Sequence, residues 1–277
     1  MKQRFSGLLS HMTLVLFIGI LGLPLYLAVV VASHSGATLV QGPLPYFPGT
    51  QLLHNMHTVL TEGLVATGGQ ATNRMLLNSF IMALCIAIGK VGLALLSAFS
   101  LVYFDLPFKK GWFALIFATM MLPVEVRIVP TFQVIASFGW LNSYVGLTLP
   151  LMASATATFL FQQFFKTVPS ALVDAAILDG AGPIRFFMDI LLPLSRNQMA
   201  AMGIVLFVYG WNQYLWPLVM TTDPHMATMV MGVHTMAGVS DQVPAWHEIM
   251  TVVLLALAPP CLVVLVLRRW FIQGFKD

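Results

Sequence analysis

Long apolar stretches constrain this chain more than any other feature, because six of them are each long enough to cross a lipid bilayer. A spanning helix needs about 20 mainly apolar residues. The six predicted spans are residues 12–31, 76–103, 112–137, 144–165, 197–220 and 249–267. The sequence therefore predicts an all-α membrane protein with six transmembrane helices, organised as a single domain over residues 1–277.

Composition supports this fold class. Only 8% of the 277 residues are charged, and 58% are hydrophobic, whereas soluble domains carry about 25% charged residues. This balance argues against a soluble enzyme, a nucleic-acid-binding protein or a disordered chain. Cys85 and Cys261 lie in apolar runs, away from any cluster of cysteine and histidine, so neither a metal site nor a disulfide is expected.

The distribution of basic residues predicts the orientation. Lysine and arginine gather in the loops on the cytoplasmic side of a membrane protein. Ten of the 13 basic residues would lie on one side: Lys2, Arg4, Lys109, Lys110, Lys166, Arg185, Arg196, Arg268, Arg269 and Lys276. Both termini are therefore predicted to be cytoplasmic, and residues 32–74 and 221–247 are predicted to face outward.

Residues 168–194, between the fourth and fifth spans, are predicted to form a helix–turn–helix outside the bilayer. Gly180 can adopt the left-handed conformation that ends a first helix. Pro183 suits the first turn of a second helix, which Pro193 is expected to end. A helix that lies on lipid is expected to have a basic rim. This loop is more acidic than that, so its composition favours a protein partner.

The same loop carries a sequence signature. It consists of Asp174-Ala175-Ala176, then Gly180, then Ile190-Leu191-Leu192-Pro193. This signature resembles the Glu-Ala-Ala…Gly…Ile-x-Leu-Pro pattern of bacterial ABC importer permeases. The one departure is aspartate in place of the usual glutamate. The resemblance implies the type I permease architecture, in which this loop is a coupling helix seated in a cleft of the ATP-hydrolysing subunit. The implied coupling residues are Asp174, Ala175, Ala176, Asp179, Gly180, Ala181 and Pro193.

A resemblance over nearly the whole chain narrows the family. Residues 120–131, 146–165 and 209–218 are similar to the permeases of the carbohydrate-uptake class, and to those of sn-glycerol-3-phosphate importers in particular. The resemblance implies import of sn-glycerol-3-phosphate or its diesters across the bacterial inner membrane. It also implies three kinds of partner: a second homologous permease, two copies of an ABC ATPase and a periplasmic binding protein.

Catalysis is not expected of this chain, because the sequence has no phosphate-binding loop, dinucleotide fingerprint or local catalytic signature. ATP and Mg²⁺ would bind the partner ATPase, and no cofactor would bind this chain. One alternative from another class stays open. It is an ion-coupled secondary transporter that acts alone, with Lys90 and Glu125 as a proton relay.

Three charged residues lie within the predicted spans. Each ionised side chain costs about 2.5–3.5 kcal/mol at the bilayer centre unless it pairs or faces a polar cavity. Lys90 and Glu125 could pair with each other. Two roles are open for Arg127. It is a phosphate ligand, since guanidinium matches phosphate oxygens two at a time, or its side chain reaches the outer membrane–water interface. Pro123 and Pro130 are expected to break the helix around it.

The fifth predicted span carries a polar and aromatic stripe. Tyr209, Asn212, Gln213 and Trp216 follow helical spacing and would share one face, which suits a hydroxylated ligand. The alternatives are buried amides that hold helices together and an aromatic belt at the interface. The candidate substrate-path residues are Lys90, Glu125, Arg127, Tyr209, Asn212, Gln213 and Trp216. A similar stripe of Ser154, Thr158 and Gln162 is predicted to serve packing.

Overall fold

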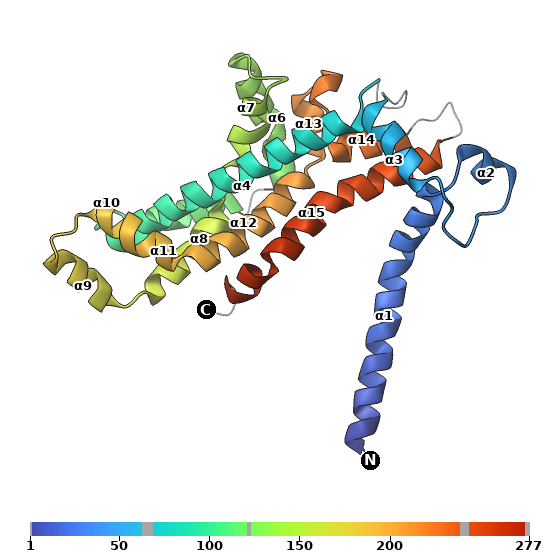
Figure 1. Cartoon of the computed structure of the whole chain (residues 1–277). Helices are drawn as coiled ribbons and strands as arrows, with labels where there is room; N and C mark the ends of the chain where they lie inside the picture. The colour runs from blue at the N-terminus through green and yellow to red at the C-terminus, as the bar shows by residue number, and fades with distance from the viewer. Residues whose placement is uncertain (1, 63–68, 121–122, 239–243, 275–277) are drawn as a thin grey trace. The chain divides into compact units, whose positions relative to one another are not determined.

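The structure is a computed structural model that describes residues 2–62, 69–120, 123–238 and 244–274. Side chains are described for these residues except 2–10, 120, 124, 125 and 271–274. Over the described residues, all regular secondary structure is helical (Figure 1). The chain divides into two compact units, Met1–Leu76 with Met231–Ala258 and Leu77–Val230 with Pro259–Asp277.

The first unit contains the long N-terminal helix α1 (Lys2–Ala32) and the shorter helices α2 (Gly36–Gln41) and α3 (Leu52–Thr61). Side chains from Met12 to Leu25 in α1 are largely apolar and exposed, as expected of a helix surrounded by lipid. Among the described side chains of α1, those near its C-terminal end are packed. There, Asn55 of α3 donates hydrogen bonds to the carbonyl oxygens of Ala32 (2.8 Å) and His34 (2.9 Å).

The second unit is built around α4 (Thr72–Tyr103), which starts in the first unit. The other helices of this unit, in chain order, are α5 (Lys109–Met120), α6 (Val124–Ser137), α7 (Tyr144–Thr148), η2 (Leu149–Leu151), α8 (Ala155–Thr167), α9 (Ser170–Leu178), α10 (Pro183–Phe186), η3 (Phe187–Leu191), α11 (Leu192–Leu194), α12 (Arg196–Trp211), α13 (Leu215–Met220) and η4 (Pro224–Met226). Helices α14 (Met229–Ala237) and α15 (Trp246–Gly274) span both units.

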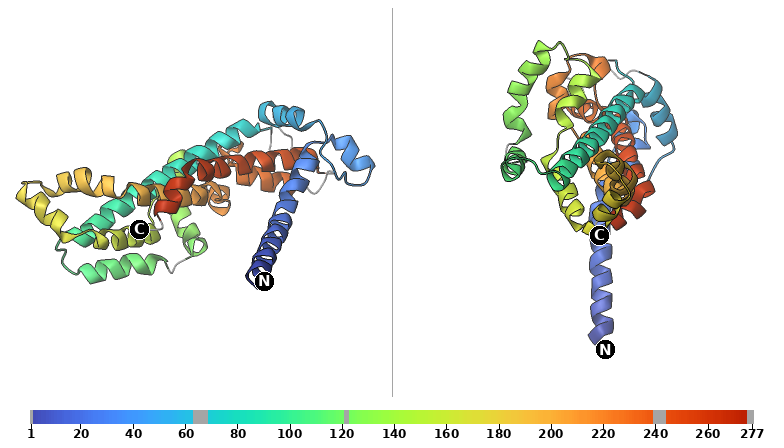
Figure 2. Two further views of the ribbon diagram at one scale, coloured as in Figure 1. Left: turned by 60° about the horizontal axis from the view of Figure 1, so that its bottom comes forward. Right: turned by 90° about the vertical axis from the view of Figure 1, so that its left-hand side faces the viewer.

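Helices α4 and α12 lie side by side in the second unit (Figures 1 and 2). Their backbones come close at Gly210, where an added Cβ would lie 2.9 Å from Cα of Ala83. Small residues allow such close approach between membrane helices, where van der Waals packing replaces the hydrophobic effect as the driving force. The Gly210–Ala83 contact therefore fixes how these two helices pack.

Three described helices are long and apolar enough to cross a membrane: His11–Ala32, Thr72–Tyr103 and Trp246–Trp270. They correspond to the first, second and sixth predicted spans. Two bent pairs raise the number to five if each is one span, namely Tyr144–Leu151 with Ala155–Thr167 (47°) and Pro183–Leu194 with Arg196–Trp211 (73°). The chain is thus a helical multi-pass membrane protein, while the count of six remains a prediction.

The predicted span 197–220 is not one helix. Helix α12 ends at Trp211, and α13 begins only at Leu215, so the residues between them are not helical. The predicted span 112–137 is likewise divided between α5 and α6; residues 121 and 122 lie outside the described part of the chain.

Two prolines expected to break helices lie inside helical segments. Pro130 is within α6, and Pro193 is within α11. Proline lacks an N–H and clashes with the carbonyl four residues earlier in an α-helix. The π-helical turn η3 ends at Leu191, two residues before Pro193, and its wider spacing relieves that clash. The chain bends instead at Ser195, whose hydroxyl donates to the carbonyl oxygen of Leu191 (2.6 Å).

Candidate functional site

Lys90 is a buried cation on α4, with 7% of its surface exposed. Its ammonium lies 3.9 Å from the centroid of the Tyr209 ring on α12. Such a cation–π contact lowers the cost of burying the charge. The structure thus brings together two of the predicted path residues. The predicted Lys90–Glu125 pair is not addressed, because the side chain of Glu125 lies outside the described residues.

Arg127 lies on α6 with an exposed side chain. It is the second cation of the predicted substrate path, besides Lys90. Among the described side chains, neither of these two residues forms an ion pair, and the one ion pair is between Arg185 and Asp189 (3.3 Å). Positive side chains attract anionic groups, which is the chemistry predicted for Lys90 on α4 and Arg127 on α6.

The predicted stripe on one helical face is wrong, since the helix ends at Trp211 before three of its four members. Asn212 is exposed, and Gln213 donates from Nε2 to the carbonyl oxygen of Tyr209 (3.1 Å). The side-chain amide of Gln213 thus binds the carbonyl oxygen that its own backbone N–H would bind if the helix continued, and that N–H donates to Gly210 instead. Tyr209 and Gln213 remain adjacent through this hydrogen bond.

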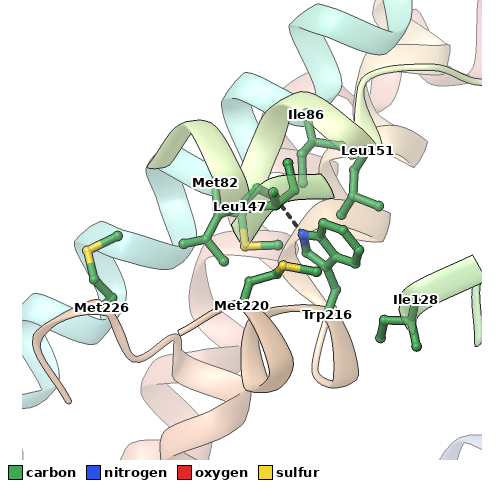
Figure 3. Close-up of a cluster of buried hydrophobic side chains, with 9 residues drawn as sticks. Met82, Ile86, Ile128, Leu147, Leu151, Trp216, Met220 and Met226 are labelled. Atoms are coloured by element: carbon green, nitrogen blue, oxygen red, sulfur yellow. Dashed lines mark hydrogen bonds between the residues drawn. The ribbon is translucent and has the colours of Figure 1, made fainter. Parts of the chain in front are cut away.

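Trp216 lies in the core of the second unit, with 3% of its surface exposed. Its indole N–H donates to the carbonyl oxygen of Leu147 (3.0 Å), as Figure 3 shows. The surrounding buried side chains come from six elements, α4, α6, α7, η2, α13 and η4: Met82, Ile86, Ile128, Ile135, Leu147, Leu151, Met220 and Met226. This buried position favours a role in packing for Trp216. Packing was one of the roles that the sequence left open for the polar and aromatic stripe.

We expect Trp216→Phe to lower the thermal stability of the protein. The change keeps an aromatic ring but leaves the Leu147 carbonyl unpaired, which costs about 1–3 kcal/mol for a buried acceptor. Thermal unfolding of the detergent-solubilised chain measures this loss of stability. Trp112→Phe is the matched control, because that indole is 52% exposed and donates to the carbonyl oxygen of Pro107. Equal shifts for both variants would contradict the packing role.

The sequence did not single out two amides that hold the segment after α13. Asn78 is fully buried on α4 and donates to the carbonyl oxygens of His225 (2.8 Å) and Ala227 (2.9 Å). Its Oδ1 accepts from the hydroxyl of Tyr144 (2.6 Å). Asn142, with φ of 55°, accepts from the backbone of Thr222 (2.7 Å). An amide inside an apolar span was the signal for Asn78.

The loop over residues 168–194 forms the expected helix, turn and helix. Helix α9 ends at Leu178, and Gly180, two residues later, has φ of +72° in the left-handed region, as predicted. Gly180 N–H donates to the carbonyl oxygen of Ile177 (3.0 Å), and Ala181 N–H to that of Ala176 (2.9 Å). This pair of hydrogen bonds is the Schellman motif. Pro183 begins α10, also as predicted.

The tip of this loop presents apolar side chains to solvent. Ile177, Leu178 and Ile184 are 66%, 88% and 78% exposed. Asp174 and Asp179 are exposed beside them. Of the other predicted coupling residues, Ala175 and Pro193 are exposed, Ala181 is partly buried and Ala176 is buried. Large apolar side chains at this density on an exposed turn indicate a contact surface.

The comparison with known families fits a helical membrane domain with an exposed apolar loop. Residues 90–277 match the family described as binding-protein-dependent transport system inner membrane component. This chain belongs to that family.

Relatives of similar length support the assignment. The chain is 46% identical over 276 residues to the sn-glycerol-3-phosphate transport system permease protein UgpE of Rhizobium meliloti. The identity is 47% for the protein of the same name from Agrobacterium fabrum and 48% for that from Escherichia coli K12. Each alignment covers 100% of this chain and 98% of the relative.

The fold also has a solved counterpart. The chain superposes with a TM-score of 0.83 on a chain of a bacterial ABC transporter involved in the import of the acidic polysaccharide alginate. The match covers 98% of both chains at 16% sequence identity, so it establishes the fold alone.

Proposed function

We propose that this chain is a permease subunit of an ATP-driven importer and forms half of the path for sn-glycerol-3-phosphate, or its diesters, across the bacterial inner membrane. The observation that carries this proposal is the full-length identity of 46–48% to permeases named for that substrate. The match over residues 90–277 to an inner-membrane transport family supports the location and the transport role.

Arg127, Lys90 and Tyr209 form the proposed contact region for the substrate, with Asn212, Gln213 and Glu125 along the path. A phosphate monoester carries a charge of about −1.5 to −2 at pH 7. Lys90 and Arg127 carry the opposite charge, and no ion pair with a described side chain competes for it. Arg127 would bind phosphate oxygens through its planar guanidinium, and Trp216 would act through packing alone.

The loop over residues 168–194 is the proposed coupling helix, seated in a cleft of the ATPase. The exposed Asp174 and the exposed apolar tip support this role. A second homologous permease, two ATPase copies and a periplasmic binding protein would complete the importer. ATP and Mg²⁺ would bind the ATPase, whose closure the loop would transmit to the spans in alternating access.

Reconstitution of the importer tests the function. Proteoliposomes that contain this chain, the second permease and the ATPase should take up labelled sn-glycerol-3-phosphate only with ATP inside and the loaded binding protein outside. A protonophore should leave uptake unchanged. ATP-independent uptake by this chain alone that the protonophore abolishes would instead identify an ion-coupled secondary transporter. ATP-driven uptake of other solutes, but not of sn-glycerol-3-phosphate, would contradict the proposed substrate.

Labelling of single cysteines tests the proposed orientation, with both termini and the coupling loop in the cytoplasm. In a background with Cys85 and Cys261 replaced by alanine, His225→Cys should react with an impermeant thiol reagent added to intact spheroplasts. Ser170→Cys should react only after lysis. Both positions are exposed, so access to the reagent depends on the side of the membrane. The reverse pattern would overturn the orientation.

A further inference from the structure

A second basic site lies in the second unit, apart from Lys90 and Arg127. A cavity of about 300 Å³ is lined by Lys109 and Lys110 at the start of α5 and by Gln162 and Lys166 on α8. These two helices pack against each other (Figure 2). The remaining lining residues are apolar, and no acidic residue is among them. The cavity therefore combines three positive charges with an apolar wall.

The lysines differ in how they are held. Lys109 donates from Nζ to the carbonyl oxygens of Val102 (3.2 Å) and Phe104 (3.4 Å), at the end of α4. This contact with a helix C-terminus positions its charge. Within the described part of the chain, Lys110 and Lys166 are in no ion pair. Their ammonium groups are thus available to an anion in the cavity.

Gln162 provides a second, independent observation. Its side chain is 95% buried, and its Oε1 accepts no hydrogen bond within the described structure. A buried acceptor without a partner is costly, and native proteins seldom leave one. Its position in the cavity wall suggests that a bound molecule supplies the missing donor. Such a molecule would carry an anion for the lysines and a hydroxyl for the amide.

The surroundings of the cavity indicate where that molecule comes from. Phe108, directly before Lys109, is 88% exposed and has φ of 55°, and Trp112 is 52% exposed. Exposed aromatic side chains next to lysines at the end of a membrane helix are typical of the lipid headgroup layer. A dissolved anion would need no such apolar neighbours. Basic pockets between membrane helices bind acidic headgroups.

We propose that this cavity binds the headgroup of an acidic phospholipid, with the phosphodiester between Lys110 and Lys166 and a headgroup hydroxyl donating to Oε1 of Gln162. Phosphatidylglycerol has both groups. The site is separate from the proposed substrate path. Its ligand nevertheless shares the glycerol phosphate group with the proposed substrate, so the experiment must distinguish a lipid from a dissolved phosphate ester.

Native mass spectrometry of the purified full chain in detergent tests the site. The wild-type chain should retain phosphatidylglycerol in preference to phosphatidylcholine. The variant Lys110→Gln/Lys166→Gln should bind phosphatidylglycerol about thirtyfold more weakly, since each lysine near an anionic headgroup contributes about a factor of five. The matched control Arg268→Gln/Arg269→Gln removes two exposed charges outside the cavity and should bind like the wild type.

Two further arms identify the ligand. Millimolar inorganic phosphate or sn-glycerol-3-phosphate should not displace the lipid. Phosphatidylmethanol has the same charge but no headgroup hydroxyl; the wild type should prefer phosphatidylglycerol to it, and Gln162→Leu should lose that preference while binding both lipids. Equal weakening in the two double variants would overturn the site. Displacement by the dissolved anions would overturn the lipid as its ligand, and an unchanged preference in Gln162→Leu would overturn the role of the amide.

Discussion

Gly180→Val should reduce uptake by the reconstituted importer to the background level, while the chain still inserts and assembles. Gly180 has φ of +72° at the end of α9. A residue with a Cβ pays about 1–2 kcal/mol in this conformation, and valine is among the least tolerant. The strain would open the Schellman motif between Ala176 and Ala181 and turn the contact loop away from the ATPase.

Two controls separate backbone conformation from bulk in this experiment. Gly180→Asn adds a side chain that tolerates the left-handed region, so it should keep a substantial part of uptake. Gly182→Val places the same valine at φ of −71°, which any residue adopts, and it should transport far better than Gly180→Val. ATP-driven uptake and complex yield are measured together. Wild-type uptake by Gly180→Val would remove the loop from coupling.

Arg127→Ala should slow uptake about tenfold to a hundredfold, because a hydrogen bond to a charged group contributes about 1.5–3 kcal/mol. The binding protein would still deliver the substrate, so ATP hydrolysis stimulated by the loaded binding protein should continue. Arg127→Lys should restore part of the rate, because it keeps the charge but not the planar fork.

Complex yield decides between a substrate ligand and a structural partner. If Arg127 is a substrate ligand, Arg127→Ala should give a normal yield of complex. If Arg127 is the partner of a buried carboxylate, the variant should lose assembled complex, since the orphaned charge destabilises the fold. Arg74→Ala removes an exposed arginine from the start of α4 and serves as the control, with unchanged uptake. Normal yield together with normal uptake for Arg127→Ala would contradict its proposed role.

Local patterns predicted the loop well. The turn at Gly180 and the helix start at Pro183 depend on residues close in sequence, whose backbone preferences are strong. The long helices α1, α4 and α15 were also predictable, because length and apolar composition alone allow a helix to cross a bilayer. Full-length relatives supported the family that the loop signature suggested.

Contacts between distant residues were not predictable in the same way. The Lys90–Tyr209 contact joins two helices more than a hundred residues apart, and no pattern within either helix indicates it. The end of α12 at Trp211 was missed because helical spacing continues in the sequence where the backbone does not. The basic cavity is not predictable from the sequence, because Lys109 and Lys110 lie more than fifty residues from Lys166 and only the packing of α5 on α8 brings them together.

The close approach at Gly210 has a mechanical consequence. Its neighbour Tyr209 covers Lys90, while Gly210 itself holds α12 against Ala83 of α4. A Cβ at position 210 would wedge the two helices apart and withdraw the ring from the ammonium. Helix α12 is also bounded by a bend at Ser195 and a non-helical break after Trp211. Helix α12 is thus a single helical segment that is held against α4 and is interrupted at both of its ends.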